Sequence, residues 1–433
     1  MTEALRARMR TFYTVWTGQV VSMVGTGLTS FALGVWVYQK TGSATSFALI
    51  FLFMELPGIL ISPLAGALVD RYDRRLVMIF SDLVAGLASA IVLVLALMGS
   101  LEVWHIYLVV AIGSVGNAFQ LPAYLATLPL MVPEERLGQA NGLTQTAQAI
   151  RQVLAPAMAG FLLLEIGIQG VVAIDVVTFL VALVTLMMVR FPRPEPAEGE
   201  IPGGMKGELT FGLAYIFRHP GLLAILLVIA WFSFILSIIG PLITPMILEF
   251  TTPAVLGILT SIGGVGMLFG GFAMSSWGGP ERRIHGVLGF LMLSGIALMA
   301  HGLAPSSVLI GICAFFFFGT LPFVFACNDI IWQTKVAPEV LGKVLAARQM
   351  LTRLTAPVGY FVAGPLADHV FEPMLEEGGS LSASVGQVIG VGAGRGIAFM
   401  FILGGASVLL VAAIGYLVPS LRRVEDEPPG AGA

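Results

Sequence analysis

Long apolar segments recur along almost the whole chain, and each is long enough to cross a bilayer. A helix rises about 1.5 Å per residue, so a hydrocarbon core of about 30 Å requires about twenty apolar residues. Such segments occur at 12–38, 44–70, 75–99, 103–131, 138–164 and 168–190, and again at 219–248, 254–277, 283–303, 306–334, 342–370 and 392–419. The pattern predicts an all-α membrane protein with twelve transmembrane helices in two six-helix bundles.

Composition excludes a water-soluble fold of this size. Of the 433 residues, 57% are hydrophobic and 11% are charged, whereas soluble domains carry about 25% charged residues. The net charge of −3 gives no indication of a nucleic-acid partner. Membrane lipid is the surrounding that this composition requires.

Basic residues indicate how the chain is oriented, because cytoplasmic loops are enriched in Lys and Arg. With a cytoplasmic N-terminus, only Lys40 and Arg395 of the 22 basic residues fall outside the cell. Three more lie within spans, namely Arg151, Arg348 and Arg353, and the others lie inside the cell. We therefore expect a multi-pass protein of the bacterial inner membrane with both termini in the cytoplasm.

A stretch rich in proline, glycine and acidic residues interrupts the apolar segments after residue 190, as a linker does. Its last part, Glu208 to Arg218, reads as a short amphipathic piece on the cytoplasmic interface. The expected domains are therefore a bundle over 1–190, a linker over 191–218, and a bundle with a short tail over 219–433.

The two halves resemble each other. Pro133-Glu-Glu-Arg-Leu-Gly precedes the fifth span, and Pro338-Glu-Val-Leu-Gly precedes the eleventh. Parallel repeats of this kind place a substrate path at the repeat interface near the bilayer midplane. Because one chain holds a complete pathway, we expect it to function as a monomer.

Charged side chains within the spans are costly in lipid, and by default they indicate function. The candidates for proton or substrate coupling are Glu55, Asp175, Asp329 and Arg151. The alternative for each acid is a structural pair with one of the arginines inside the spans. Asp82 lies close to the cytoplasmic end of the third span, where we expect it to reach water.

Polar side chains also recur at helical spacing on single faces of several spans. These stripes should face either a cavity or one another. The candidate cavity-lining residues are Gln19, Asn117, Gln120, Tyr124, Gln148, Gln152, Trp231 and Asn328.

A segment between the second and third spans carries a known signature. Gly66-Ala-Leu-Val-Asp70-Arg71-Tyr-Asp-Arg74-Arg75 resembles the major facilitator signature G-x-x-x-D-R-x-G-R-R, with Asp73 in place of the second glycine. Trp16-Thr-Gly-Gln19-Val-Val-Ser22 and Leu137-Gly-Gln-Ala-Asn141-Gly142-Leu resemble the macrolide-efflux and enterobactin-exporter branch of drug:proton antiporters.

The resemblance implies a gating role for Gly66, Asp70, Arg71, Arg74 and Arg75. Gly66 would allow close helix approach, and Asp70 could pair with an arginine or face a helix N-terminus when the cytoplasmic side closes. The alternative is that the arginines only set the topology.

A second signature bears on the direction of transport. Ala147-x-x-x-Arg151-x-x-x-Ala155-Pro156-x-x-Ala159-Gly160 resembles the antiporter signature of exporters, although Arg151 stands at a glycine position. The arginine that the family carries in the fourth span is absent here.

The resemblance implies a secondary active exporter of amphipathic small molecules, such as drugs, macrolide-like compounds, siderophores or other secondary metabolites. The implied mechanism is proton antiport with alternating access, and the partners are the substrate and protons. The sequence contains no nucleotide-binding loop, metal motif or nucleophile elbow, so we expect neither a cofactor nor an enzyme. The alternatives are uptake or lipid flipping by the same fold, or a non-transporting membrane sensor.

Overall fold

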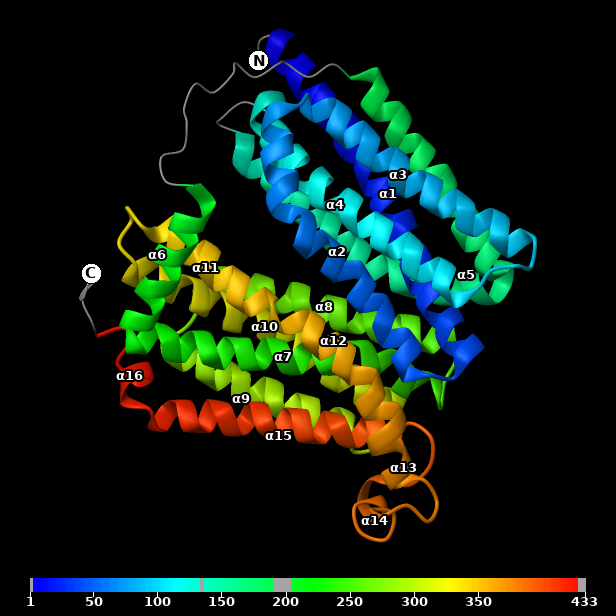
Figure 1. The fold of residues 1–433 in the computed structure, drawn as a ribbon, viewed down its shortest axis with the longest axis vertical. Helices are drawn as coiled ribbons and strands as arrows, with labels where there is room; N and C mark the ends of the chain where they lie inside the picture. The colour runs from blue at the N-terminus through cyan, green and yellow to red at the C-terminus, as the bar shows by residue number, and fades with distance from the viewer. Residues whose placement is uncertain (1–2, 133–135, 190–203, 427–433) are drawn as a thin grey trace. The chain divides into compact units, whose positions relative to one another are not determined.

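The computed structural model describes residues 3–132, 136–189 and 204–426 (Figure 1). All regular structure among them is helical, and helices occupy all twelve predicted apolar ranges. Ten of the described helices are long and apolar enough to cross a membrane. The predicted fold class is therefore confirmed, although α5 contains two of the predicted spans and the eleventh span is divided into shorter helices.

The chain divides into two compact units, which are described separately: Met1–Ala197 with Thr252–Ser261, and Glu198–Thr251 with Ile262–Ala433. The first unit contains α1 (Glu3–Thr41), α2 (Ala44–Arg71), α3 (Arg74–Leu97), α4 (Val103–Met131) and α5 (Leu137–Met188). In this unit α1 packs along α5, α2 packs on α4, and α3 packs on both α4 and α5.

Side-chain caps fix where two helices of the first unit begin. The Ser43 hydroxyl accepts a hydrogen bond from the Ser46 amide at 3.2 Å at the start of α2. The Asp73 carboxylate accepts one from the Arg75 amide at 2.9 Å at the start of α3. Asp73 is the residue that departs from the glycine of the signature, and its role here is that of an N-cap.

A single glycine joins the fifth and sixth predicted spans within α5. Gly167 has φ 65° and ψ −177° and interrupts the helical backbone. Only glycine adopts this conformation readily. The two spans are therefore connected without a loop.

The second unit contains the remaining helices and begins with α6 (Gly204–Arg218) and α7 (Pro220–Leu248). They are followed by α8 (Pro253–Trp277, its first turns belonging to the first unit), α9 (Arg283–His301), α10 (Ser307–Lys335), α11 (Leu341–Arg353), α12 (Thr355–Leu366), the π-helical turn η2 (Ala367–Phe371), α13 (Glu372–Leu375), α14 (Gly386–Ile389), α15 (Arg395–Leu417) and α16 (Pro419–Arg422). In Figure 1, α15 runs alongside α9, and the two helices pack together.

Glycines bring α8 and α10 into backbone contact. A Cβ added to Gly266 would lie 2.2 Å from the Phe315 carbonyl oxygen, and one added to Gly270 would lie 2.1 Å from that of Gly319. Small residues four apart permit this approach in membrane helices.

The predicted amphipathic piece forms part of α6, which packs on α11. Tyr215 and Ile216 of α6 are buried. The first residues of the predicted linker, 191–203, lie outside the described residues.

Directly after the eleventh predicted span, Glu372 binds the start of α15. Its carboxylate accepts hydrogen bonds from the amides of Gly394, at 3.0 Å, and Ile397, at 2.9 Å. An acidic side chain at this place satisfies free N–H groups of the helix start.

Candidate functional site

Three polar side chains from three helices meet inside the first unit. The carboxylate of Asp82 on α3 accepts a hydrogen bond at Oδ2 from Nε2 of Gln19 on α1, at 3.1 Å. Its Oδ1 accepts a short hydrogen bond from Nε2 of Gln120 on α4. The same Gln120 nitrogen donates to Oε1 of Gln19 at 3.2 Å. We call these three residues the amide–carboxylate cluster.

The placement of Asp82 corrects the expectation that it reaches water. Its side chain is buried, with a residue exposure of 5%. Asp82 lies eight residues into α3, about 12 Å along the helix axis at 1.5 Å per residue. Two helices distant in sequence supply the amides that cover it, and only their matching polar stripes could have signalled this.

A second buried acid of the first unit is held by hydroxyl groups. Asp175 on α5 is 2% exposed. Its Oδ1 accepts from the Thr26 hydroxyl of α1 at 3.2 Å, and its Oδ2 accepts from the Ser89 hydroxyl of α3 at 2.8 Å. The donors to Asp175 are therefore neutral hydroxyl groups. These contacts differ from the arginine pair that is the structural alternative for this acid.

The partners of the two acids form two levels along α1 and α3. Gln19 and Thr26 are seven residues apart on α1, and Asp82 and Ser89 are seven apart on α3. Seven residues correspond to two helical turns, or about 10 Å. The α1 and α3 helices therefore present two polar levels between them, each with one buried carboxylate.

In the second unit the coupling candidate Asp329 forms an ion pair. Its Oδ1 lies 2.8 Å from Nη2 of Arg348 on α11. The Arg348 guanidinium also lies over the Trp332 ring, 5.5 Å from its centroid. The indole N–H of Trp332 donates to Asn328 at 3.1 Å, and Asn328 is buried. The ion pair with Arg348 is the structural alternative to a coupling role for Asp329.

The other predicted coupling and cavity-lining residues of the first unit are exposed or partly buried. Glu55 on α2 and Asn117 on α4 are exposed, as are Gln148 and Gln152 on α5. The hydroxyls of Tyr124 and Thr144 are 3.4 Å apart. The stem of Arg151 lies against Gly27 of α1, where an added Cβ would be 3.2 Å from its Cγ.

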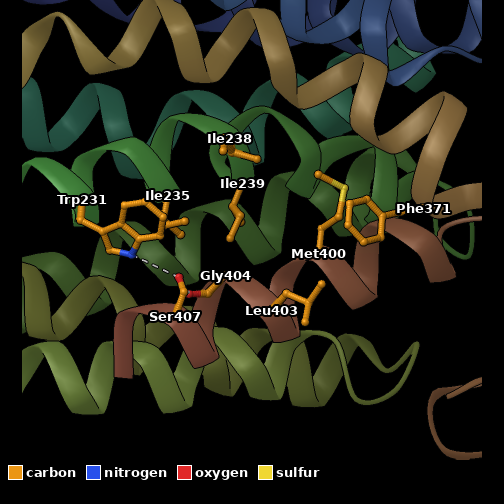
Figure 2. Close-up of a pocket in the computed structure, with 9 residues that line it drawn as sticks. All are labelled: Trp231, Ile235, Ile238, Ile239, Phe371, Met400, Leu403, Gly404 and Ser407. Carbon is orange, nitrogen blue, oxygen red and sulfur yellow. Dashed lines mark hydrogen bonds between the residues drawn. The ribbon is translucent and has the colours of Figure 1, made fainter. Parts of the chain in front are cut away.

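Trp231 lines an apolar pocket between α7 and α15, with a volume of about 170 Å³. Figure 2 shows Trp231 and Ser407 at one end and Phe371 with Met400 at the other. The Trp231 indole N–H donates to the Ser407 hydroxyl at 3.3 Å. The two polar groups of this lining therefore bind each other, which leaves an apolar surface.

The profile of the Major Facilitator Superfamily matches residues 15–360. The chain belongs to the major facilitator superfamily. Macrolide efflux protein A of Streptococcus pyogenes is 28% identical over 96% of this chain and 97% of its own length. The protein of the same name from Enterococcus faecalis is 31% identical over 70% of this chain and 95% of its own.

More distant matches agree with this assignment. The multidrug efflux pump Tap of Mycolicibacterium fortuitum is 24% identical over 79% of this chain and 86% of its own. A bacterial homologue of the human lysosomal transporter Spinster shares the fold, with a TM-score of 0.70 and 15% identity over 98% of this chain and 99% of that one. The resemblance predicted from the sequence is confirmed.

In this major facilitator protein, the signature joins α2 to α3. The side chains of Gly66, Asp70 and Arg71 lie outside what the structure describes. Arg75 donates from Nε to the Leu186 carbonyl at 3.3 Å and from Nη2 to the Met187 carbonyl at 2.7 Å. One signature arginine therefore satisfies free carbonyls at the C-terminus of α5.

Proposed function

We propose that this chain is a secondary active exporter of amphipathic small molecules, and that macrolides are among its substrates. The observation that carries the proposal is similarity to macrolide efflux proteins, over 96% of this chain for the Streptococcus pyogenes protein and 70% for the Enterococcus faecalis protein. The drive is proton antiport, and access to the substrate path alternates between the two sides of the membrane. Within the first unit, the path is lined by the polar faces of α1, α4 and α5.

Among the predicted coupling residues, the contacts favour Asp175 as a proton carrier. Asp329 already has the cation Arg348 at 2.8 Å, so it is part of an ion pair between α10 and α11. Glu55 is exposed on α2. Asp175 is buried and held by hydroxyls, which can donate to a carboxylate and accept from a carboxylic acid. Arg151 remains a proposed substrate contact for anionic or carbonyl groups.

Transport of a radiolabelled macrolide in inside-out membrane vesicles tests the function. Acidifying the vesicle interior should drive accumulation, and a protonophore should abolish it. Vesicles from cells lacking the protein serve as the control. Absence of accumulation would overturn the proposal for macrolides, and enhanced uptake by intact cells or scrambling of a fluorescent lipid would replace export with one of the alternatives.

The gate is tested by Asp70→Asn, which keeps the size of the side chain but removes its charge. We expect slower macrolide export at normal amounts of inserted protein. Export at the wild-type rate would remove Asp70 from the gate.

We further propose that the protein lies in the bacterial inner membrane with both termini in the cytoplasm and functions as a monomer. The native Cys313 and Cys327 are buried, so introduced thiols should label selectively. Glu377→Cys should react with an impermeant maleimide in intact cells, whereas Glu339→Cys should react only after permeabilisation. Labelling of both from the same side would refute this topology.

A further inference from the structure

The amide–carboxylate cluster contains an ionisable side chain within a membrane-spanning helix. Such side chains are rare and almost always have a partner. Asp82 is buried, and both of its carboxylate oxygens accept hydrogen bonds from carboxamides, Gln19 at Oδ2 and Gln120 at Oδ1. Gln19 and Gln120 are themselves only partly buried. The two glutamines are therefore more accessible than the acid that they bind.

The helices around Asp82 supply no cation to it among the described residues. Arg74 and Arg75 are at the start of the same helix, and the Arg75 guanidinium binds the carbonyls of Leu186 and Met187. Asp175 of α5 binds Ser89, which lies two turns further along α3 than Asp82. A buried carboxylate without a cation is costly while it is charged.

Carboxamides suit an acid that changes its protonation state. A carboxylate only accepts hydrogen bonds, whereas a carboxylic acid must also donate one. A glutamine side chain presents an NH₂ donor in one orientation and a C=O acceptor after rotation. The cluster can therefore satisfy Asp82 in both states, whereas an arginine beside an acid can satisfy only the ionised one.

We infer that Asp82 is a reversible proton-binding site of this transporter, with Gln19 and Gln120 as positioning residues that hold both of its protonation states. This rests on the proposed proton drive. A proton from water adds to one oxygen of the Asp82 carboxylate, and one amide rotates so that its carbonyl accepts the new O–H. Release of the proton to water on the other side reverses both changes, and no other bond forms or breaks.

Infrared difference spectroscopy of the purified protein in lipid tests the site directly, because its probe is the proton alone. Spectra recorded at acidic minus alkaline pH should contain a carboxylic-acid C=O band that disappears in Asp82→Asn. The band should persist in Asp73→Asn, a control that changes an exposed aspartate at the start of the same helix. A spectrum of Asp82→Asn identical to that of the wild type would overturn the inference.

The role of the amides has its own readout. Gln120→Leu removes a hydrogen-bond donor and acceptor, so the C=O band of Asp82 should move to higher frequency. Asn117→Leu, an exposed site on the same helix, should leave the frequency unchanged. This comparison also tests the inference if Asp82→Asn fails to insert into the membrane. An unshifted C=O band in Gln120→Leu would contradict the positioning role of Gln120.

Transport separates this inference from the proposed function. Asp82→Asn should lose macrolide accumulation driven by a pH gradient but retain macrolide counterflow, because exchange needs no net proton transfer. Accumulation at the wild-type level in Asp82→Asn would refute the inference and leave the proposed function intact. If the wild type transports no macrolide, the proposed substrate is wrong and the infrared band alone decides whether Asp82 binds the proton.

Discussion

The guanidinium of Arg348 on α11 lies 2.8 Å from the carboxylate of Asp329 on α10, and this pair joins the two helices inside the second unit. Asp329→Asn leaves the largely buried arginine without its anion. Because the Asp329 side chain is 49% exposed, we expect a loss of about 1–2 kcal/mol rather than the larger cost of breaking a fully buried pair. Thermal unfolding of Asp329→Asn, Arg348→Gln and the double variant measures it. Strictly additive losses would show that the two side chains do not interact energetically.

Two neighbouring glycines of α8 should respond differently to substitution by alanine, because only one of them contacts α10. Gly270→Ala places a methyl group against the Gly319 backbone and should destabilise the fold by about 1–3 kcal/mol. Gly271 has open space at its Cβ position, so Gly271→Ala should be neutral or slightly stabilising, since alanine favours a helix. The midpoints of thermal unfolding should differ in that order. Equal midpoints would contradict the described contact.

The arginine at the start of α3 should protect the end of α5. Arg75→Gln removes the two hydrogen bonds to the carbonyls of Leu186 and Met187, at an expected cost of about 1 kcal/mol. Amide hydrogen exchange should accelerate in the last turn of α5 and remain unchanged in the last turn of α15. Arg75→Lys should give an intermediate rate, because an ammonium group lacks the guanidinium fork.

Glu372 should make stability depend on pH. Burial raises its pKa above the ordinary value of 4.5. This effect outweighs the hydrogen bonds from backbone amides, which lower the pKa because they bind the charged form. The folded state therefore holds this proton more tightly than the unfolded chain, so its contribution to stability should decrease as pH rises from about 4.5 through the raised pKa. Unfolding midpoints measured across that range should be flatter in Glu372→Gln than in the wild type. The exposed Glu376→Gln is the control and should retain the wild-type slope.

Hydropathy predicted the fold well because lipid, like the protein interior, selects for apolar segments of a fixed length. The predicted range 103–131 coincides with α4, Val103–Met131, and 254–277 begins one residue after α8. The division of the eleventh span could not be predicted, because composition does not report the change to π-helical hydrogen bonding at Ala367–Phe371.

The site was less predictable, because helical periodicity gives the face of a residue but not the helix that it meets. Helical periodicity places Gln19 and Thr26, which are seven residues apart, on one face of α1. Nothing in the local sequence shows that they meet Asp82 and Asp175. The position of Asp82 near the end of its span predicts access to water, and this prediction is wrong because the side chain is buried. Its carboxylate accepts a hydrogen bond from Gln120, which is 38 residues away in the chain.

The single glycine that joins the two spans of α5 also limits how the chain can change in length. Successive residues of a helix are rotated by about 100°, and Gly167 leaves no loop in which an added or missing residue could be absorbed. An insertion or deletion of one residue here would rotate the second span and turn Asp175 away from Thr26 and Ser89. Natural length variation should therefore be rare at this turn and more frequent in the segment 376–394, which has room to accommodate it.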